Sequence, residues 1–167
     1  MSRLHILRYP DPRLHKVAAP VKEVNNSVRT LAADMAETMY AAPGVGLAAT
    51  QVNVHKQVIV IDASDTRDRL VTLINPEILA AFGVADCEEG CLSVPGIYEK
   101  IGRAERVIVR ALGLDGQSFS MEAEGLLAVC IQHEMDHLKG RVFVEYLSRL
   151  KQTRIRAKMQ KQQRQSA

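Results

Sequence analysis

The chain has 167 residues, 47% of them hydrophobic and 25% charged, with a net formal charge of +3, the balance of a globular protein that can bury its own core. No apolar stretch approaches the roughly 20 residues of a membrane-spanning helix, and the first residues carry Arg3 and Arg8 without the continuous apolar core of a signal peptide. Three cysteines are an odd set, which argues against a disulfide framework. We therefore expect a single domain over residues 1–167, located in the cytoplasm, with no membrane partner.

The N-terminal part of the chain predicts a turn-rich start followed by a helix. Pro12 and Pro20 mark the extended, turn-rich start. Residues 25–27 (Asn-Asn-Ser) can cap a helix, and apolar residues then recur at helical spacing up to Met39. The proline and glycines of residues 43–46 end this helix.

The middle of the chain predicts four short strands, three of them rich in β-branched residues. They cover residues 57–62, 70–74, 106–112 and 118–122. The dipeptide Asn75-Pro76 closes the second strand, and a turn at residues 114–116 joins the last two. Residues 89–95 and 96–100 are expected as loops.

The last third predicts two helices. Residues 125–140 contain good helix formers and finish with Gly140, and the apolar character of their first half indicates a helix that lies deep in the molecule. A second helix is expected from Leu147 to about Arg164. Because strands and helices do not alternate regularly, we expect an α+β fold, with short antiparallel sheets around the buried central helix and one helix near each end of the chain.

The C-terminal segment is strongly basic. Seven of the 22 basic residues and none of the 19 acidic residues lie from position 149 onward, which leaves residues 1–148 with a formal charge of −4. The seven are Arg149, Lys151, Arg154, Arg156, Lys158, Lys161 and Arg164. Such a segment is typical either of a solvated helix face or of a surface that binds an anionic partner such as RNA.

Residues 133–137 (His-Glu-Met-Asp-His) form an H-E-x-x-H pattern inside the predicted central helix. Residues four apart are separated by about 40° around a helix, so the imidazoles of His133 and His137 can reach one metal ion. Glu134 lies about 100° from His133, close enough to act on a water at the metal without being a ligand. Two histidines at this spacing are often structural, but the glutamate between them favours a catalytic metal site.

A catalytic metal needs a third protein ligand and an open position. Beyond His137 the only acid before the final helix is Glu145, so the upstream cysteines are the better candidates for the third ligand. Cys91, beside a glycine in an expected loop, is the best candidate, and spacing alone leaves Cys87 as a rival. Cys130 lies on an apolar helix face, where a role in the core is expected.

Residues 44–49 (Gly-Val-Gly-Leu-Ala-Ala) match a dinucleotide-binding fingerprint, but that fingerprint must follow a strand and open a helix. Here the order of elements is reversed. The glycines are better explained by a backbone that lies close to a ligand, with Gln51 as a nearby amide donor.

Three segments together resemble the peptide deformylase family. Residues 44–51 match its G-x-G-x-A-A-x-Q motif, residues 89–93 (Glu-Gly-Cys-Leu-Ser) match E-G-C-L-S, and residues 132–137 match Q-H-E-x-D-H. The three occur in family order, and the resemblance extends over essentially the whole chain, as a single catalytic domain. It implies removal of the formyl group from formyl-methionine at the N-terminus of nascent polypeptides, with release of formate.

The resemblance also implies the site residues. Cys91, rather than Cys87, would bind the metal together with His133 and His137. The ion expected from the family is Fe²⁺, with Zn²⁺, Ni²⁺ or Co²⁺ able to take its place, whereas thiolate and imidazole chemistry alone would favour zinc. Glu134 would act as acid and base, and the Gln51 amide and the Leu92 backbone N–H would stabilise the oxyanion.

The resemblance further implies a set of substrate-binding residues: Val45, Gly46, Glu89, Gly90, Leu126, Val129, Cys130 and His133. Of these, Val45, Leu126, Val129 and Cys130 would form an apolar pocket for the methionine side chain, with His133 at its floor. Two further interpretations stay open: Arg103 and Glu89 form a structural ion pair or guide the peptide, and Asp136 is either solvated or a partner of the metal site.

The expected partners are formyl-methionyl nascent peptides, and the basic helix at residues 147–164 is a candidate contact with the ribosome. We expect a monomer that binds no DNA. Two alternatives remain at this level: a metalloprotease that cleaves internal peptide bonds, and a non-catalytic module that uses the same metal site for folding.

Overall fold

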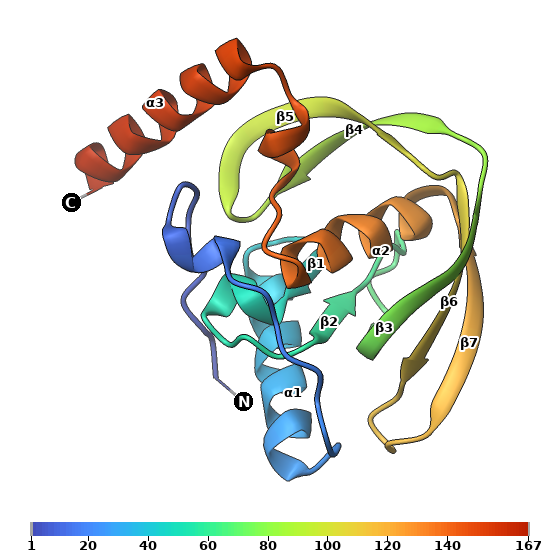
Figure 1. Cartoon of the computed structure of the whole chain (residues 1–167). Helices are drawn as coiled ribbons and strands as arrows, with labels where there is room; N and C mark the ends of the chain where they lie inside the picture. Colours follow the sequence, from blue (N-terminus) through green and yellow to red (C-terminus); the bar gives the residue numbers. More distant parts are fainter. Residues whose placement is uncertain (1, 167) are drawn as a thin grey trace.

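The computed structural model describes residues 2–166, which form two antiparallel sheets and three α-helices, with α2 at the centre and α1 and α3 on the outside (Figure 1). The larger sheet has the strand order β1-β2-β3-β6-β7, and the smaller sheet consists of β4 and β5. The strands are β1 (Gly46–Ala48), β2 (Val58–Ile61), β3 (Val71–Phe82), β4 (Ala85–Cys91), β5 (Val94–Arg103), β6 (Arg106–Leu112) and β7 (Ser118–Glu124). The helices are α1 (Asn26–Ala41), α2 (Gly125–Leu138) and α3 (Arg149–Ser166), with 3-10 turns η1 (Pro12–His15), η2 (Ala49–Val52) and η3 (Phe143–Tyr146). The predicted α+β class is confirmed.

Helix α1 begins and ends where its sequence signals predict. The Asn25 side chain accepts a hydrogen bond of 3.1 Å from the backbone N–H of Val28, which satisfies one of the free donors of the first turn. The helix ends at Ala41, two residues before Pro43. Val28, Met35 and other residues of its buried face pack against β2 and the start of β3.

Strand β3 continues through Asn75-Pro76, so the prediction that it ends there is wrong. The register with β6 shifts between Ile74 and Glu77, and Asn75 has a φ of 51°. A bulge of this kind accommodates a proline, which has no N–H to give to the ladder. The Asn75 side chain accepts from Val21 N at 2.7 Å and donates to Val21 O at 2.8 Å, so the bulge is tied to the N-terminal segment.

Residues 85–103 form a β-hairpin, so the loops expected at 89–95 and 96–100 are also corrected. Cys91 pairs with Val94 across a two-residue turn, and Cys87 pairs with Ile101. The apolar residues of β5 that face inward are few, and they are buried against Ile155 and Met159 of α3. Because these partners lie more than 50 positions away in the sequence, local periodicity did not reveal the strands.

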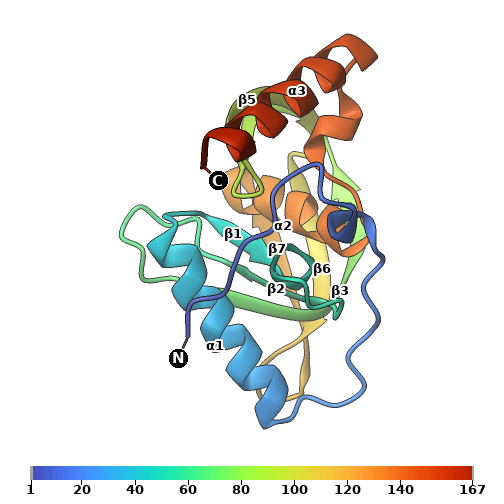
Figure 2. The same ribbon diagram turned by 90° about the vertical axis from the view of Figure 1, so that its left-hand side faces the viewer.

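Helix α2 lies inside the curve of the five-stranded sheet (Figures 1 and 2). Its residues Ala128, Ile131, Met135 and Leu138 share a core cluster with Ile59 and other apolar residues of β2, β3, β6 and β7. Helix α1 covers the opposite side of β2. The sheet is therefore buried on both sides near β2, and α2 is enclosed.

Helix α3 is anchored by two apolar side chains, although the sequence of this segment is marked mainly by its basic residues. Ile155 and Met159 are buried among residues of β5, η3 and the N-terminal segment. Within residues 2–166, no helix combines the length and apolar character needed to cross a bilayer.

Candidate metal centre and substrate cavity

Helix α2 and the turn of the β4–β5 hairpin bring three potential metal ligands together. The donor atoms of Cys91, His133 and His137 all lie within 4.8 Å of one another, and Cys91 Sγ is 3.3 Å from His137 Nε2. Metal bonds of about 2.3 Å to sulfur and 2.0 Å to nitrogen place tetrahedral neighbours roughly 3.5 Å apart. The donor set and its spacing therefore fit one ion. Of the three cysteines, this group contains Cys91 and neither Cys87 nor Cys130.

The pKa values of the two buried histidines shift in opposite directions. Burial lowers the pKa of His137 well below its usual value, so its imidazole is neutral, as a metal ligand must be. Burial also acts to lower the pKa of His133, but the Glu134 charge and hydrogen bonds to Cys91 and Glu89 outweigh it and raise that pKa well above its usual value.

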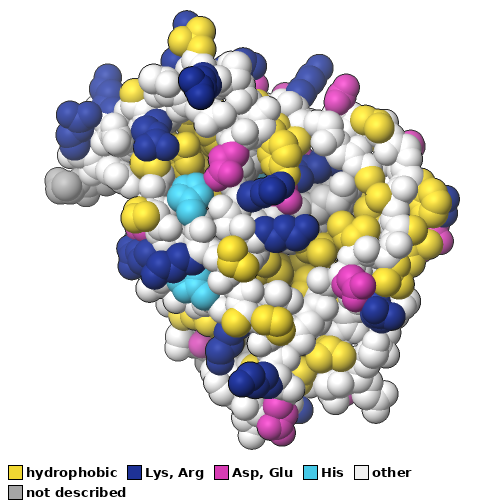
Figure 3. Space-filling view, viewed as in Figure 1, with side chains coloured by type: hydrophobic (Ala, Val, Ile, Leu, Met, Phe, Trp, Pro, Cys, Tyr) yellow, Lys and Arg dark blue, Asp and Glu magenta, His cyan; other side chains and the backbone are white. Residues whose placement is uncertain are grey.

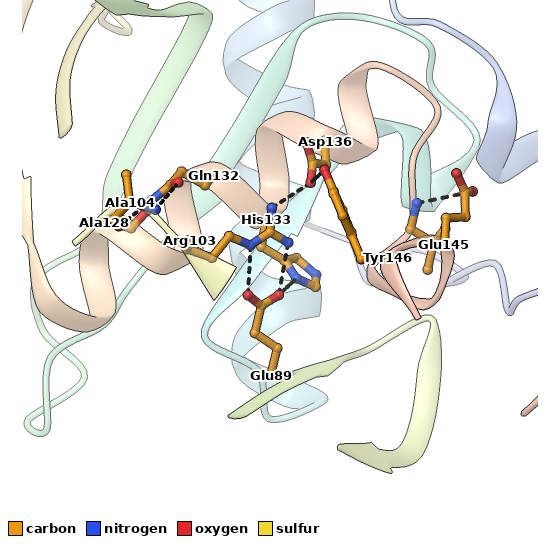
Figure 4. Close-up of polar contacts among 10 residues, drawn as sticks. Glu89, Arg103, Ala104, Ala128, Gln132, His133, Asp136, Glu145 and Tyr146 are labelled. Atoms are coloured by element: carbon orange, nitrogen blue, oxygen red, sulfur yellow. Dashed lines mark hydrogen bonds and ion pairs between the residues drawn. The ribbon is translucent and has the colours of Figure 1, made fainter. Parts of the chain in front are cut away.

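His133 is oriented by Glu89. The His133 Nδ1 atom lies 2.8 Å from Glu89 Oε1, which leaves Nε2 as the available ligand atom. Glu89 in turn accepts two hydrogen bonds from the Arg103 guanidinium, at 2.8 and 3.0 Å (Figure 4). The ion pair considered from the sequence is thus present. Both carboxylate oxygens of Glu89 are therefore engaged inside the protein.

Glu134 is enclosed next to the proposed ligands. Burial raises the pKa of Glu134 to about 7, although the charge of His133 opposes this. Its Oε1 has no hydrogen-bond partner among residues 2–166. A Cβ at Gly46 would lie 2.5 Å from Glu134 Oε2, so the carboxylate rests against the backbone of β1. This close approach explains why a glycine stands at position 46.

Gln51 joins the end of β1 to the hairpin turn. Its Oε1 accepts a hydrogen bond of 2.9 Å from Ala48 N, and its Nε2 donates to Ser93 Oγ at 3.0 Å. The same Nε2 lies 3.6 Å from Cys91 Sγ. The amide group predicted as an oxyanion donor is therefore buried beside the candidate ligand.

A cavity of about 1200 Å³ opens over this centre. Every predicted catalytic and substrate-binding residue contributes to its lining: Val45, Gly46, Gln51, Glu89, Gly90, Leu92, Leu126, Val129, Cys130, His133 and Glu134. His137 lies beneath, fully buried. Burial raises the pKa of the Cys130 thiol to about 12, so this part of the wall is neutral.

The cavity also includes residues that the sequence did not suggest. Among them are the N-terminal segment from Arg3 to Arg8, Ile97 and Tyr98 of β5, and Gln163 of α3. No motif marks them, because they meet only when the two ends of the chain fold over the hairpin. In the sequence, only Gly44 and Gly46 indicated that a segment of backbone lies close to a ligand here.

A protein-family model described as polypeptide deformylase matches residues 3–153. The chain belongs to the polypeptide deformylase family. It is therefore a hydrolase, and the family is metal-dependent, in agreement with the Cys91, His133 and His137 group.

Relatives of known name and structure agree over nearly the whole chain. Peptide deformylase 2 of Nitrosomonas europaea is 66% identical over 164 residues, which are 98% of this chain and 89% of the relative. The crystal structure of a peptide deformylase from Legionella pneumophila is 46% identical, with a TM-score of 0.94 and coverage of 99% of this chain and 98% of that one. A peptide deformylase from Ehrlichia chaffeensis, solved in complex with actinonin, is 40% identical with a TM-score of 0.95, over 98% and 99% of the two chains.

Proposed function

We propose that this hydrolase removes the formyl group from formyl-methionine at the N-terminus of newly synthesised polypeptides and releases formate. One divalent ion would be held by Cys91, His133 and His137, with Fe²⁺ as the expected ion and Zn²⁺, Ni²⁺ or Co²⁺ as possible replacements. The observation that carries the proposal is the position of Glu134: a buried carboxyl with a pKa of about 7, at the floor of a cavity and beside three metal-ligand atoms.

The donor set supports a metal of borderline softness, since two imidazoles and a thiolate suit iron and zinc better than magnesium or calcium. When bound, such an ion supplies Lewis-acid chemistry, which polarises a carbonyl and makes a water molecule more acidic. The three protein ligands leave a coordination position open.

Glu134 is proposed to move the proton. It takes a proton from the attacking water and later gives it to the leaving amine, and a pKa of about 7 suits both directions near neutral pH. The Gln51 amide, beside Cys91, and the Leu92 backbone N–H, next along the turn, are proposed to donate to the developing oxyanion. Both donors are groups of the protein itself, so no water molecule is needed as a donor to the oxyanion.

The methionine side chain is proposed to occupy the apolar part of the cavity, formed by Val45, Leu126, Val129 and the neutral Cys130 thiol. Such a wall favours an unbranched apolar side chain without requiring a charge. The cavity volume of about 1200 Å³ exceeds what a formyl-methionyl group needs, so the following residues of the peptide can lie in it as well.

The test is formate release from formyl-Met-Ala-Ser by protein purified without oxygen. We expect formate with the peptide bonds intact; internal cleavage would indicate a protease, and no formate would overturn the proposal. Glu134→Gln should lower turnover by about 10²- to 10⁴-fold while the bound metal, measured by elemental analysis, stays unchanged. Full activity in that variant would remove Glu134 from the mechanism.

A further inference from the structure

Tyr146 lies in η3, the turn that leads from α2 into α3, and half of its surface is exposed. Its hydroxyl donates a hydrogen bond of 2.8 Å to Asp136 Oδ2. The same oxygen accepts a bond of 2.6 Å from Arg103 Nη1, and the Arg103 guanidinium carbon lies 5.2 Å from the centre of the Tyr146 ring. Tyr146 thus contacts both members of the Arg103–Asp136 ion pair.

From Arg103 the contacts continue inward to the metal centre (Figure 4). The guanidinium grips both oxygens of Glu89, and Glu89 Oε1 meets His133 Nδ1 at 2.8 Å. The Arg103 and Glu89 side chains are 6% and 4% exposed, so water does not compete for these bonds. An unbroken series of contacts therefore joins a half-exposed tyrosine to a candidate metal ligand.

We propose that Tyr146 is a positioning residue of the metal centre. It fixes Asp136 and the plane of the Arg103 guanidinium, which sets Glu89 and, through it, the orientation of the His133 imidazole. The turn acts on the same histidine from a second direction, because the Phe143 ring lies 6.0 Å from the His133 ring, centre to centre. The inference rests on the proposed metal site and makes η3 part of it.

The expected loss of metal affinity depends on how many side chains separate Tyr146 from the metal ligand. Residues that hydrogen-bond a metal ligand directly typically change metal affinity by about 10- to 100-fold when replaced. Tyr146 acts through three further side chains, and the Phe replacement keeps the ring over Arg103. We therefore expect a three- to tenfold loss of affinity for Tyr146→Phe.

The experiment measures binding of Zn²⁺ by competition with a chelator and the visible absorption spectrum of the Co²⁺-loaded protein. Tyr40→Phe is a matched control, because it also removes a tyrosine hydroxyl that donates to a carboxylate, here Asp62 at 2.6 Å, in a cluster without metal ligands. Tyr146→Phe should bind Zn²⁺ more weakly and shift the Co²⁺ bands, while Tyr40→Phe should match the wild type in both.

Wild-type affinity and an unchanged Co²⁺ spectrum in Tyr146→Phe would overturn the inference. Asp136→Asn keeps the side-chain shape and must reproduce a loss at least as large; if it does not, the series does not act on His133. These readouts use the metal alone, so their outcome is separate from formate release. A wild type that binds no metal would overturn both proposals. If Tyr146→Phe changes metal binding as expected but the wild type releases no formate, only the proposed substrate is removed.

Discussion

Two clusters of an arginine, an aspartate and a tyrosine contact residues that line the cavity: one is bonded to Glu89 and the other to Gly44. The histidine-side cluster consists of Arg103, Asp136 and Tyr146 and leads to the His133 side chain. The strand-side cluster consists of Arg67, Asp62 and Tyr40. There the Tyr40 hydroxyl donates to Asp62 at 2.6 Å, and Arg67 donates to the backbone oxygens of Asp62 and Gly44 while lying over the Tyr40 ring.

The two clusters differ in the groups that each arginine binds. Arg103 is buried and paired with two carboxylates, so its charge is needed to keep Glu89 and Asp136 in the interior. Arg67 is half-buried and binds neutral carbonyl groups, one of which belongs to the segment that enters β1. The same three residue types therefore have different roles. In the histidine-side cluster they balance the charge of carboxylates, and in the strand-side cluster they fix the position of a backbone segment.

The largest expected effect is the loss of stability in Arg103→Gln. Removing this guanidinium leaves the buried Glu89 and the partly buried Asp136 without their arginine, and breaking a buried pair in this way typically costs about 3–5 kcal/mol. Urea unfolding measures the difference. Arg110→Gln is the control, since Arg110 and Glu77 form a surface pair with side chains 51% and 60% exposed, and such pairs contribute about 0–1 kcal/mol. Equal losses in the two variants would contradict the assigned role of Arg103.

A smaller and different effect is expected for Arg67→Gln. Freeing the Gly44 carbonyl loosens the wall formed by Gly44, Val45 and Gly46, which should raise KM for formyl-Met-Ala-Ser about three- to tenfold with little change in kcat. Steady-state kinetics measures the change in KM. Arg69→Gln, which removes the charge of an exposed arginine, is the control for a general effect of charge. A fall in kcat at constant KM would instead place Arg67 in the chemistry.

The strand-side cluster should also show itself in the pH dependence of stability. Burial acts to raise the pKa of Asp62, but hydrogen bonds from Ser64, Tyr40 and the backbone outweigh it and lower that pKa from 3.8 to about 2. Because the folded pKa is the lower one, the ionised carboxylate stabilises the fold above pH 3.8, and this contribution disappears as the pH falls toward 2.

Unfolding experiments on the wild type and Asp62→Asn over this range test the sign. The stability advantage of the wild type should be constant above about pH 5 and should shrink below pH 4. An advantage that grows as the pH falls would show that Asp62 is destabilised by burial rather than stabilised by its donors.

The smallest effect is expected on the surface of α3, whose basic side chains are prominent in Figure 3. The predicted ribosome contact cannot be tested by removing the helix, because Ile155 and Met159 bury the hairpin that carries Cys91. Replacing the exposed Lys158, Lys161 and Arg164 by Gln should weaken salt-dependent co-sedimentation with ribosomes and leave peptide deformylation unchanged.

The control for this experiment is the replacement of Lys16, Lys22 and Lys56, which are equally exposed and lie outside α3. It changes the net charge by the same amount. If both triple variants co-sediment alike, α3 has no special role in ribosome binding and its basic face is a solvated one.

Local periodicity was sufficient for the elements whose signals lie close together in the chain. The relation of His133, Glu134 and His137 follows from the helix repeat alone, and the cap at Asn25 and the end of α1 before Pro43 follow from backbone chemistry. These features depend on contacts between residues at most four positions apart. The sequence therefore predicted them before any packing was known.

Tertiary structure decided what depends on distant segments. The β4–β5 hairpin was missed because its buried residues have partners in α3, and only this hairpin brings Cys91 to the histidines and leaves Cys87 aside. The contact of Tyr146 with Asp136 arises in the same way, from a turn that folds back on α2. The spacing of ligands within a helix is a property of the sequence, whereas the third ligand and the groups that orient the site exist only where packing brings separate segments together.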